Sequence, residues 1–165
     1  PGRGPRLCPR RRGCARARER RRPARPVGVL IDTSVLVEYE RGRFDVDELV
    51  ADRMTGRADE PFHLSVISVS ELLHGVHRAR DRAQRARRSA FVEGVIDAFP
   101  ILPIDLLTAR THAELGAALA ERGTPIGSHD LWIAAAAVGR GLALATFDLR
   151  DFGRVPGLTV EDWSS

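Results

Sequence analysis

Short apolar runs alternate along the chain with segments of helical periodicity. The β-branched run over 27–31 is typical of a central parallel strand, because helices cover both faces of such a strand. Similar runs predict four further strands, over 62–65, 99–104, 142–145 and 158–160. Apolar positions three and four residues apart predict helices over 34–40, 45–57, 78–97, 105–122 and 131–138. The alternation predicts one α/β domain with a central, mainly parallel sheet.

Local signals set several boundaries. Ser68 and Glu71 have the Ser-x-x-Glu spacing of a capping box, which predicts that a helix begins at Ser68. Asp105 is a typical N-cap for the helix that follows it, and Gly123 marks the end of that helix. The prolines within the run over 99–104 place that strand at an edge of the sheet.

Charge divides the chain into two parts. The whole chain carries +4, to which residues 1–26 contribute +10 through eleven Arg and one Glu, so residues 27–165 carry −6. The first part is rich in Pro, Gly and Arg and is predicted to be a disordered tail, whereas residues 27–165 form the folded domain. Two interpretations of the tail stay open: a basic arm that binds nucleic acid non-specifically, or a solvated extension upstream of a native start near Val27.

The composition also limits where the protein works. No apolar run reaches the 18 residues of a membrane span, so we expect a soluble, cytoplasmic protein that does not contact a membrane. Both cysteines, Cys8 and Cys14, lie in the tail and lack the spacing of zinc ligands, as expected for a reducing compartment.

Four acidic residues follow predicted strands or open predicted helices. Asp32 and Asp148 come at the ends of strands, and Glu71 and Asp130 lie in the first turns of helices. Each is also an ordinary turn or cap residue by its local pattern. In a parallel sheet, however, all four positions fall on the rim at the carboxyl ends of the strands, where ligands bind.

Carboxylates gathered at one rim favour a metal site. They repel each other and raise each other's pKa unless a cation lies between them. Their oxygens are hard ligands that suit Mg²⁺ or Mn²⁺. One or two such ions activate water for attack on phosphate, so the pattern predicts hydrolysis of phosphodiester bonds.

Four segments carry a family resemblance, over 31–36, 68–75, 130–136 and 146–158. In their order and spacing within residues 27–160, they resemble a PIN domain of the VapC toxin type. The resemblance implies a three-layer α/β/α sandwich and a Mg²⁺-dependent endoribonuclease from a bacterial toxin–antitoxin pair. It also implies an RNA substrate, a homodimer and inhibition by a cognate antitoxin protein.

The resemblance assigns roles by position. Four residues match the family's acidic quartet, which is both catalytic and metal-binding: Asp32, Glu71, Asp130 and Asp148. The supporting hydroxyls of the family match Thr33 or Ser34, and Thr146. Asp151 is a less favoured substitute for Asp148.

The predicted helix over 78–97 is densely basic in its first half. Such a run is usually a solvated helix face, but Arg is well suited to bidentate contacts with phosphate. Arg78, Arg82 and Arg85 are therefore candidate nucleic-acid contacts.

Two other functions fit the same sequence. A binding module without turnover would keep the fold and use the tail and the basic helix to hold a partner or a nucleic acid. A ribonuclease of RNA processing would keep the chemistry without being a toxin. Metal sites of other classes fit less well, because the Glu71–His74 pair lacks the second copy that a di-iron bundle needs. A haloacid-dehalogenase-type phosphotransferase would need an Asp where Ser34 stands.

Overall fold

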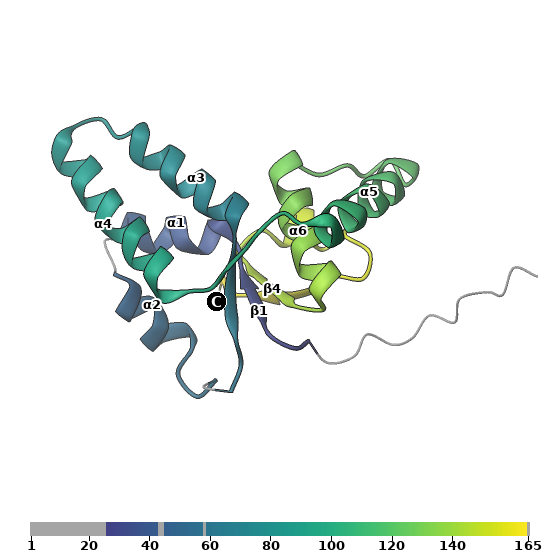
Figure 1. Cartoon of the computed structure of the whole chain (residues 1–165), viewed down its shortest axis with the longest axis horizontal. Coiled ribbons are helices and arrows are strands. Elements are labelled where there is room, and N and C mark those ends of the chain that lie inside the picture. The colour runs from purple at the N-terminus through teal and green to yellow at the C-terminus, as the bar shows by residue number, and fades with distance from the viewer. Residues whose placement is uncertain (1–25, 43–44, 58, 165) are drawn as a thin grey trace, which may run out of the picture.

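One parallel sheet crosses the centre of the molecule. The computed structural model describes residues 26–42, 45–57 and 59–164. Its five strands lie in the order β3–β2–β1–β4–β5 (Figure 1). They are β1 (Val29–Ile31), β2 (Phe62–Ser65), β3 (Ile101–Leu102), β4 (Ala143–Thr146) and β5 (Thr159–Asp162). In the parallel register, Leu30 at the centre of the sheet lies between His63 and Leu144.

Two helical layers enclose this sheet. The first layer consists of α1 (Thr33–Gly42), α2 (Val46–Arg53), α3 (Val66–His77) and α4 (Arg82–Ala98). The second layer consists of α5 (Leu106–Glu121), α6 (Ser128–Arg140) and α7 (Leu149–Phe152). Figure 1 shows the first layer on the left and α5 and α6 on the right. The predicted three-layer α/β/α sandwich is confirmed.

The strands contribute side chains to a separate hydrophobic core on each face of the sheet. Val29 and Ile31 of β1 pack into a core with side chains of α1 to α4, whereas Leu30 packs against α5 and α6. This division follows from the alternation of side chains along a strand, which sends neighbours to opposite faces. The apolar run of β1 is therefore buried on both faces, and Asp32 follows the strand directly.

The capping box predicted at Ser68 is wrong. The helix α3 already begins at Val66, and its N-cap is Ser65, whose Oγ accepts a hydrogen bond from the N–H of Ile67 at 3.1 Å. Ser68 lies inside the helix, and its buried hydroxyl has no hydrogen-bond partner among the described residues. The strand β2 turns directly into α3, so Glu71 lies in the second turn and its carboxylate is free for longer-range contacts.

Two other helix boundaries also shift. The helix predicted over 78–97 begins at Arg82, because Asp81 caps α4 by accepting from the N–H of Gln84 at 2.7 Å. The helix predicted over 45–57 ends at Arg53. The cap at Asp105 and the edge position of β3 are confirmed.

The predicted tail lies outside the described residues except for Pro26. Within residues 26–42, 45–57 and 59–164, no helix is long and apolar enough to cross a membrane.

Candidate functional site

Asp32 occupies the centre of the rim at the carboxyl ends of the strands. It follows β1 directly, is 4% exposed, and its backbone N–H donates to the carbonyl of Ala145 at 2.9 Å. Its Oδ2 accepts hydrogen bonds from Ser34 Oγ at 2.6 Å and Thr146 Oγ1 at 2.8 Å. Burial raises the pKa of Asp32, and these hydrogen bonds oppose the rise. The two hydroxyls therefore fix the orientation of a buried carboxylate.

Glu71 reaches the same rim from α3 and has both oxygens engaged. Its Oε2 accepts a hydrogen bond from Thr33 Oγ1 at 2.6 Å, and its Oε1 lies 2.7 Å from Nδ1 of His129. Thr33 opens α1 in the first layer, whereas His129 lies in the first turn of α6 in the second layer. Glu71 therefore links the two layers across the rim.

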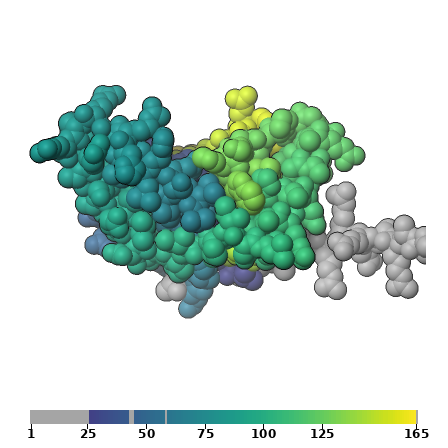
Figure 2. Space-filling view, turned by 45° about the horizontal axis from the view of Figure 1, so that its top comes forward, coloured from purple at the N-terminus to yellow at the C-terminus, as the bar shows by residue number. Residues whose placement is uncertain are grey.

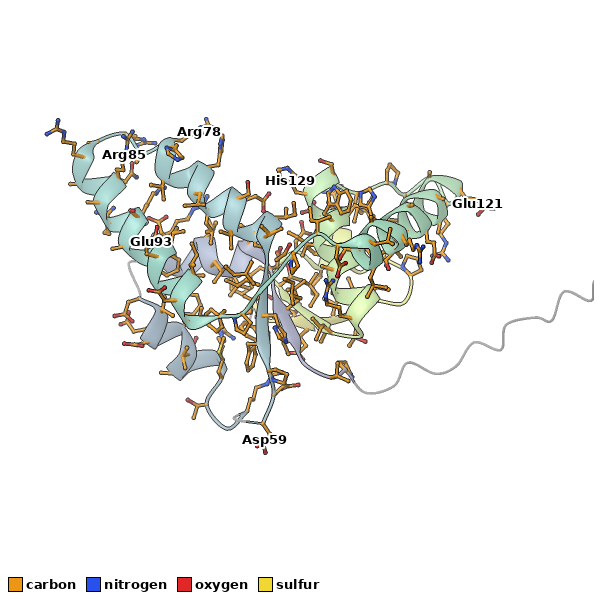
Figure 3. The ribbon with its side chains drawn as sticks, in the orientation of Figure 1. Asp59, Arg78, Arg85, Glu93, Glu121 and His129 are labelled. Carbon is orange, nitrogen blue, oxygen red and sulfur yellow. The ribbon has the colours of Figure 1, made fainter. Side chains whose placement is uncertain are left out.

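His129 is a residue that the sequence prediction missed. Its side chain is 60% exposed and, in Figure 3, it lies at the end of α6 that faces α3. The one sequence signal for it is its place directly before Asp130 at a helix start, and that signal does not reveal the contact with Glu71.

The surroundings of Asp130 indicate that the predicted acids lie near one another. Burial is the largest cause that raises its pKa, followed by the negative charges of Asp32, Glu71, Asp148 and Asp151. The carboxylate also lies against the backbone of Gly127, where any Cβ would collide with Asp130 Oδ2, so glycine makes room for this acid. The structure thus brings the four predicted acids to one rim and adds Asp151 beside them.

Asp148 combines a cap with a place at the site. Its Oδ1 accepts from the N–H of Asp151 at 3.1 Å and caps the short helix α7. Its own N–H donates to Thr146 Oγ1 at 2.9 Å, while that hydroxyl donates to Asp32. Thr146 therefore couples the positions of two of the acids.

The donor set fits a hard divalent cation, since it consists of carboxylate oxygens whose charges repel one another. Within the described part of the chain, however, no group of three or more Asp, Glu, His or Cys side chains is arranged to hold one ion. Thr33 and His129 hold the two oxygens of Glu71 at the rim, and each carboxylate oxygen keeps a further lone pair that can face a cation.

The three candidate nucleic-acid residues lie around the turn between α3 and α4. Arg78 follows the end of α3, and Arg82 and Arg85 lie in the first turns of α4. All three are exposed, and Figure 3 shows Arg78 and Arg85 at the tip of the α3–α4 hairpin.

Comparison with known proteins supplies the family. The model of the PIN domain matches residues 29–158. The ribonuclease VapC1 of Rickettsia felis is 35% identical over 139 residues, which cover 84% of this chain and 98% of the relative. The chain belongs to the PIN-domain family, in its VapC branch. The resemblance inferred from the four sequence segments is therefore confirmed.

Two further similarities place this PIN domain among its relatives. The tRNA(fMet)-specific endonuclease VapC of Salmonella typhimurium is 38% identical over 100 residues, 61% of this chain and 74% of the relative. The crystal structure of DNA-bound VapBC from the same species superposes with a TM-score of 0.73 at 31% identity, covering 83% of this chain and 98% of that chain.

Proposed function

We propose that this PIN domain is a metal-dependent endoribonuclease and the toxin of a toxin–antitoxin pair. The observation that carries the proposal is the convergence of Asp32, Glu71, Asp148 and Asp151 on Asp130, whose pKa is raised by burial and then by their charges. Two similar proteins bear the names ribonuclease VapC1 and tRNA(fMet)-specific endonuclease VapC, which supports RNA as the substrate.

In this proposal, Asp32, Glu71, Asp130 and Asp148 hold one or two ions of Mg²⁺ or Mn²⁺. A bound ion of this kind activates water and stabilises the charge that develops on the phosphate. The neighbouring hydroxyls orient the ligands, since Ser34 and Thr146 hold Asp32 and Thr33 holds Glu71. His129 holds the second oxygen of Glu71 and joins the set as a positioning residue.

The proposal includes partners. We infer a cognate antitoxin that inhibits the enzyme, because a structural relative at 31% identity was solved as VapBC. A homodimer and a cytoplasmic location follow from the resemblance alone and belong to the same proposal.

Cleavage of RNA by the purified chain tests this function. We expect Mg²⁺-dependent cuts in total or transfer RNA that EDTA abolishes. Asp32→Asn should lower the rate by at least about a hundredfold, a loss comparable to removal of a transition-state stabiliser. Asp97→Asn is the matched control, because it makes the same change at an exposed position of α4 and should leave the rate unchanged.

The other outcomes select among the alternatives. Cleavage that survives Asp32→Asn or EDTA would overturn the metal mechanism. A folded chain that binds RNA without cutting it would be a binding module. Cleavage without growth arrest on expression would indicate a nuclease of RNA processing instead of a toxin.

A further inference from the structure

A groove of about 430 Å³ opens in the first layer beside the acidic site. It is lined by α1, by the inner face of α3 and by α4. Glu71, Gly75 and Arg78 line it at spacings of four and three residues, so it follows one face of α3. At 1.5 Å per residue, this face extends about 10 Å from the acidic site to the α3–α4 hairpin. Figure 2 shows the teal hairpin projecting at one end of the molecule, away from green α5 and α6.

One arginine holds the walls of the groove together. The Nε of Arg88 lies 3.2 Å from Glu40 Oε1, and its Nη1 donates to the carbonyl of Gly75 at 2.9 Å. This side chain therefore connects α4 to both α1 and α3. It also compensates the charge of Glu40, so Glu71 is the one acid of the lining without an arginine partner among the described residues.

Three other arginines line the groove and are available to bind an anion. Arg41, Arg78 and Arg80 are exposed and make no ion pair or side-chain hydrogen bond with any described residue. Hydrogen bonds hold the backbone that carries Arg80. The N–H of Arg80 donates to Gln84 Oε1 at 2.8 Å, and the Gln84 N–H is bound by the cap at Asp81, which fixes the turn between α3 and α4.

We propose that this groove binds the phosphate backbone of the RNA strand that leaves the acidic site. The proposal rests on the proposed function and names Arg41, Arg78 and Arg80 as the contacts. A planar guanidinium can donate two parallel hydrogen bonds to a phosphate, and a series of them suits a polyanion better than a single small anion. Glu71 belongs both to the groove and to the acidic site, so a strand held in the groove leads to the bond to be cut.

This assignment separates arginines that the sequence could not distinguish. Arg82 and Arg85 lie on α4, which forms one wall of the groove, but neither residue lines the groove. They form a matched control, since their removal lowers the charge of the hairpin by the same amount outside the groove.

Salt-dependent RNA binding tests the proposal. The parent is the full-length Asp32→Asn chain in EDTA, and the probe is a fluorescently labelled single-stranded RNA measured by anisotropy. We expect Arg78→Ala/Arg80→Ala to weaken binding about tenfold and to reduce the slope of log K against log salt by about 1.4, or about 0.7 per phosphate. Arg82→Ala/Arg85→Ala should change the affinity by less than about threefold. The tail is identical in all variants, so any contribution it makes to RNA binding is the same in each of them.

A double substitution that keeps the charge separates an effect on folding from an effect of charge. Arg78→Lys/Arg80→Lys should keep the salt slope, and thermal unfolding should confirm that every variant is folded. Equal losses in the two alanine pairs, or no loss in either, would overturn the proposal. So would a groove variant that binds RNA normally and fails to bind the antitoxin. Cleavage by the wild-type chain is measured separately, so a failure of the proposed function is distinguishable from a failure of the groove.

Discussion

The two helical layers cover the same sheet but differ in packing. In the second layer, Ala134–Ala137 of α6 are all buried, and a Cβ at Gly116 of α5 would already lie 3.3 Å from Leu131. The first layer uses larger side chains in its core and leaves an arginine-lined groove between α1, α3 and α4. The second layer is thus a close-packed scaffold, and the first layer carries the open surface on which a ligand can bind.

The acidic site draws on both layers. Glu71 comes from the first layer, His129 and Asp130 come from the second, and the sheet supplies Asp32 at its centre. The contact between Glu71 and His129 joins the layers at the rim. We therefore expect substitutions in the second layer to affect stability, substitutions in the groove of the first layer to affect ligand binding, and substitutions at the rim to affect catalysis.

The largest effect is expected from a cavity in the scaffold. Leu119→Ala removes a side chain that is 1% exposed in the core of the second layer. We expect a loss of about 3 kcal/mol in the free energy of unfolding, measured with urea. The control is Leu106→Ala on the same helix, where the side chain is 65% exposed and the loss should stay below about 0.5 kcal/mol. Similar losses at the two positions would show that the second layer is not close-packed.

The next effect concerns the contact between the layers. His129→Ala removes one of the two groups that hold the Glu71 carboxylate. We expect the rate of RNA cleavage at saturating substrate to fall about tenfold, equivalent to about 1.4 kcal/mol, with little change in KM. His129→Asn should recover most of the rate, because its amide nitrogen can take the place of Nδ1. Recovery by neither Asn nor Gln, together with a raised KM, would point to contact with RNA instead of positioning of Glu71.

Whether a feature could be predicted from the sequence depends on how far apart along the chain its contacting residues lie. The position of Asp32 was predictable, because a short apolar run that ends in an acid is typical of a parallel strand that delivers a side chain to the rim of its sheet. The helix start at Val66 was not. Ser65 and Ser68 are both good N-caps by local pattern, and the Ser-x-x-Glu spacing favours the wrong one. The carboxylate that would complete the capping box instead contacts Thr33 and His129, which are 38 and 58 residues away.

The groove shows the same dependence on tertiary structure. Arg78 was a candidate because it begins a basic run, but Arg41 lies outside that run, at the end of another helix. The two share a surface because α1 packs beside α3, and no local pattern reports that packing.

A smaller effect compares two arginines that connect helices, one in each layer. Arg140 donates to Thr108 Oγ1 and Asp105 Oδ2, each at 2.8 Å, and joins α6 to the start of α5. Arg140→Ala and Arg88→Ala should each cost about 1 kcal/mol in urea unfolding. Only Arg88→Ala should also weaken RNA binding, by a few-fold, because Arg88 lines the groove and Arg140 does not. Equal RNA affinities of the two variants would contradict the division between scaffold and binding layer.

The smallest effect concerns the turn that carries Arg80. Asp81→Ala removes the cap of α4 and should cost about 0.5–1 kcal/mol in thermal or urea unfolding. It also removes a negative charge beside the groove, which by itself strengthens RNA binding. Asp81→Asn removes the same charge but keeps an oxygen that can accept from the Gln84 N–H, so the difference between the two variants isolates the cap. If RNA binding in the groove needs a fixed turn, Asp81→Asn should bind RNA about two- to threefold more tightly than Asp81→Ala. Equal affinities of the two variants would show that the arginines act through their charge and need no fixed position.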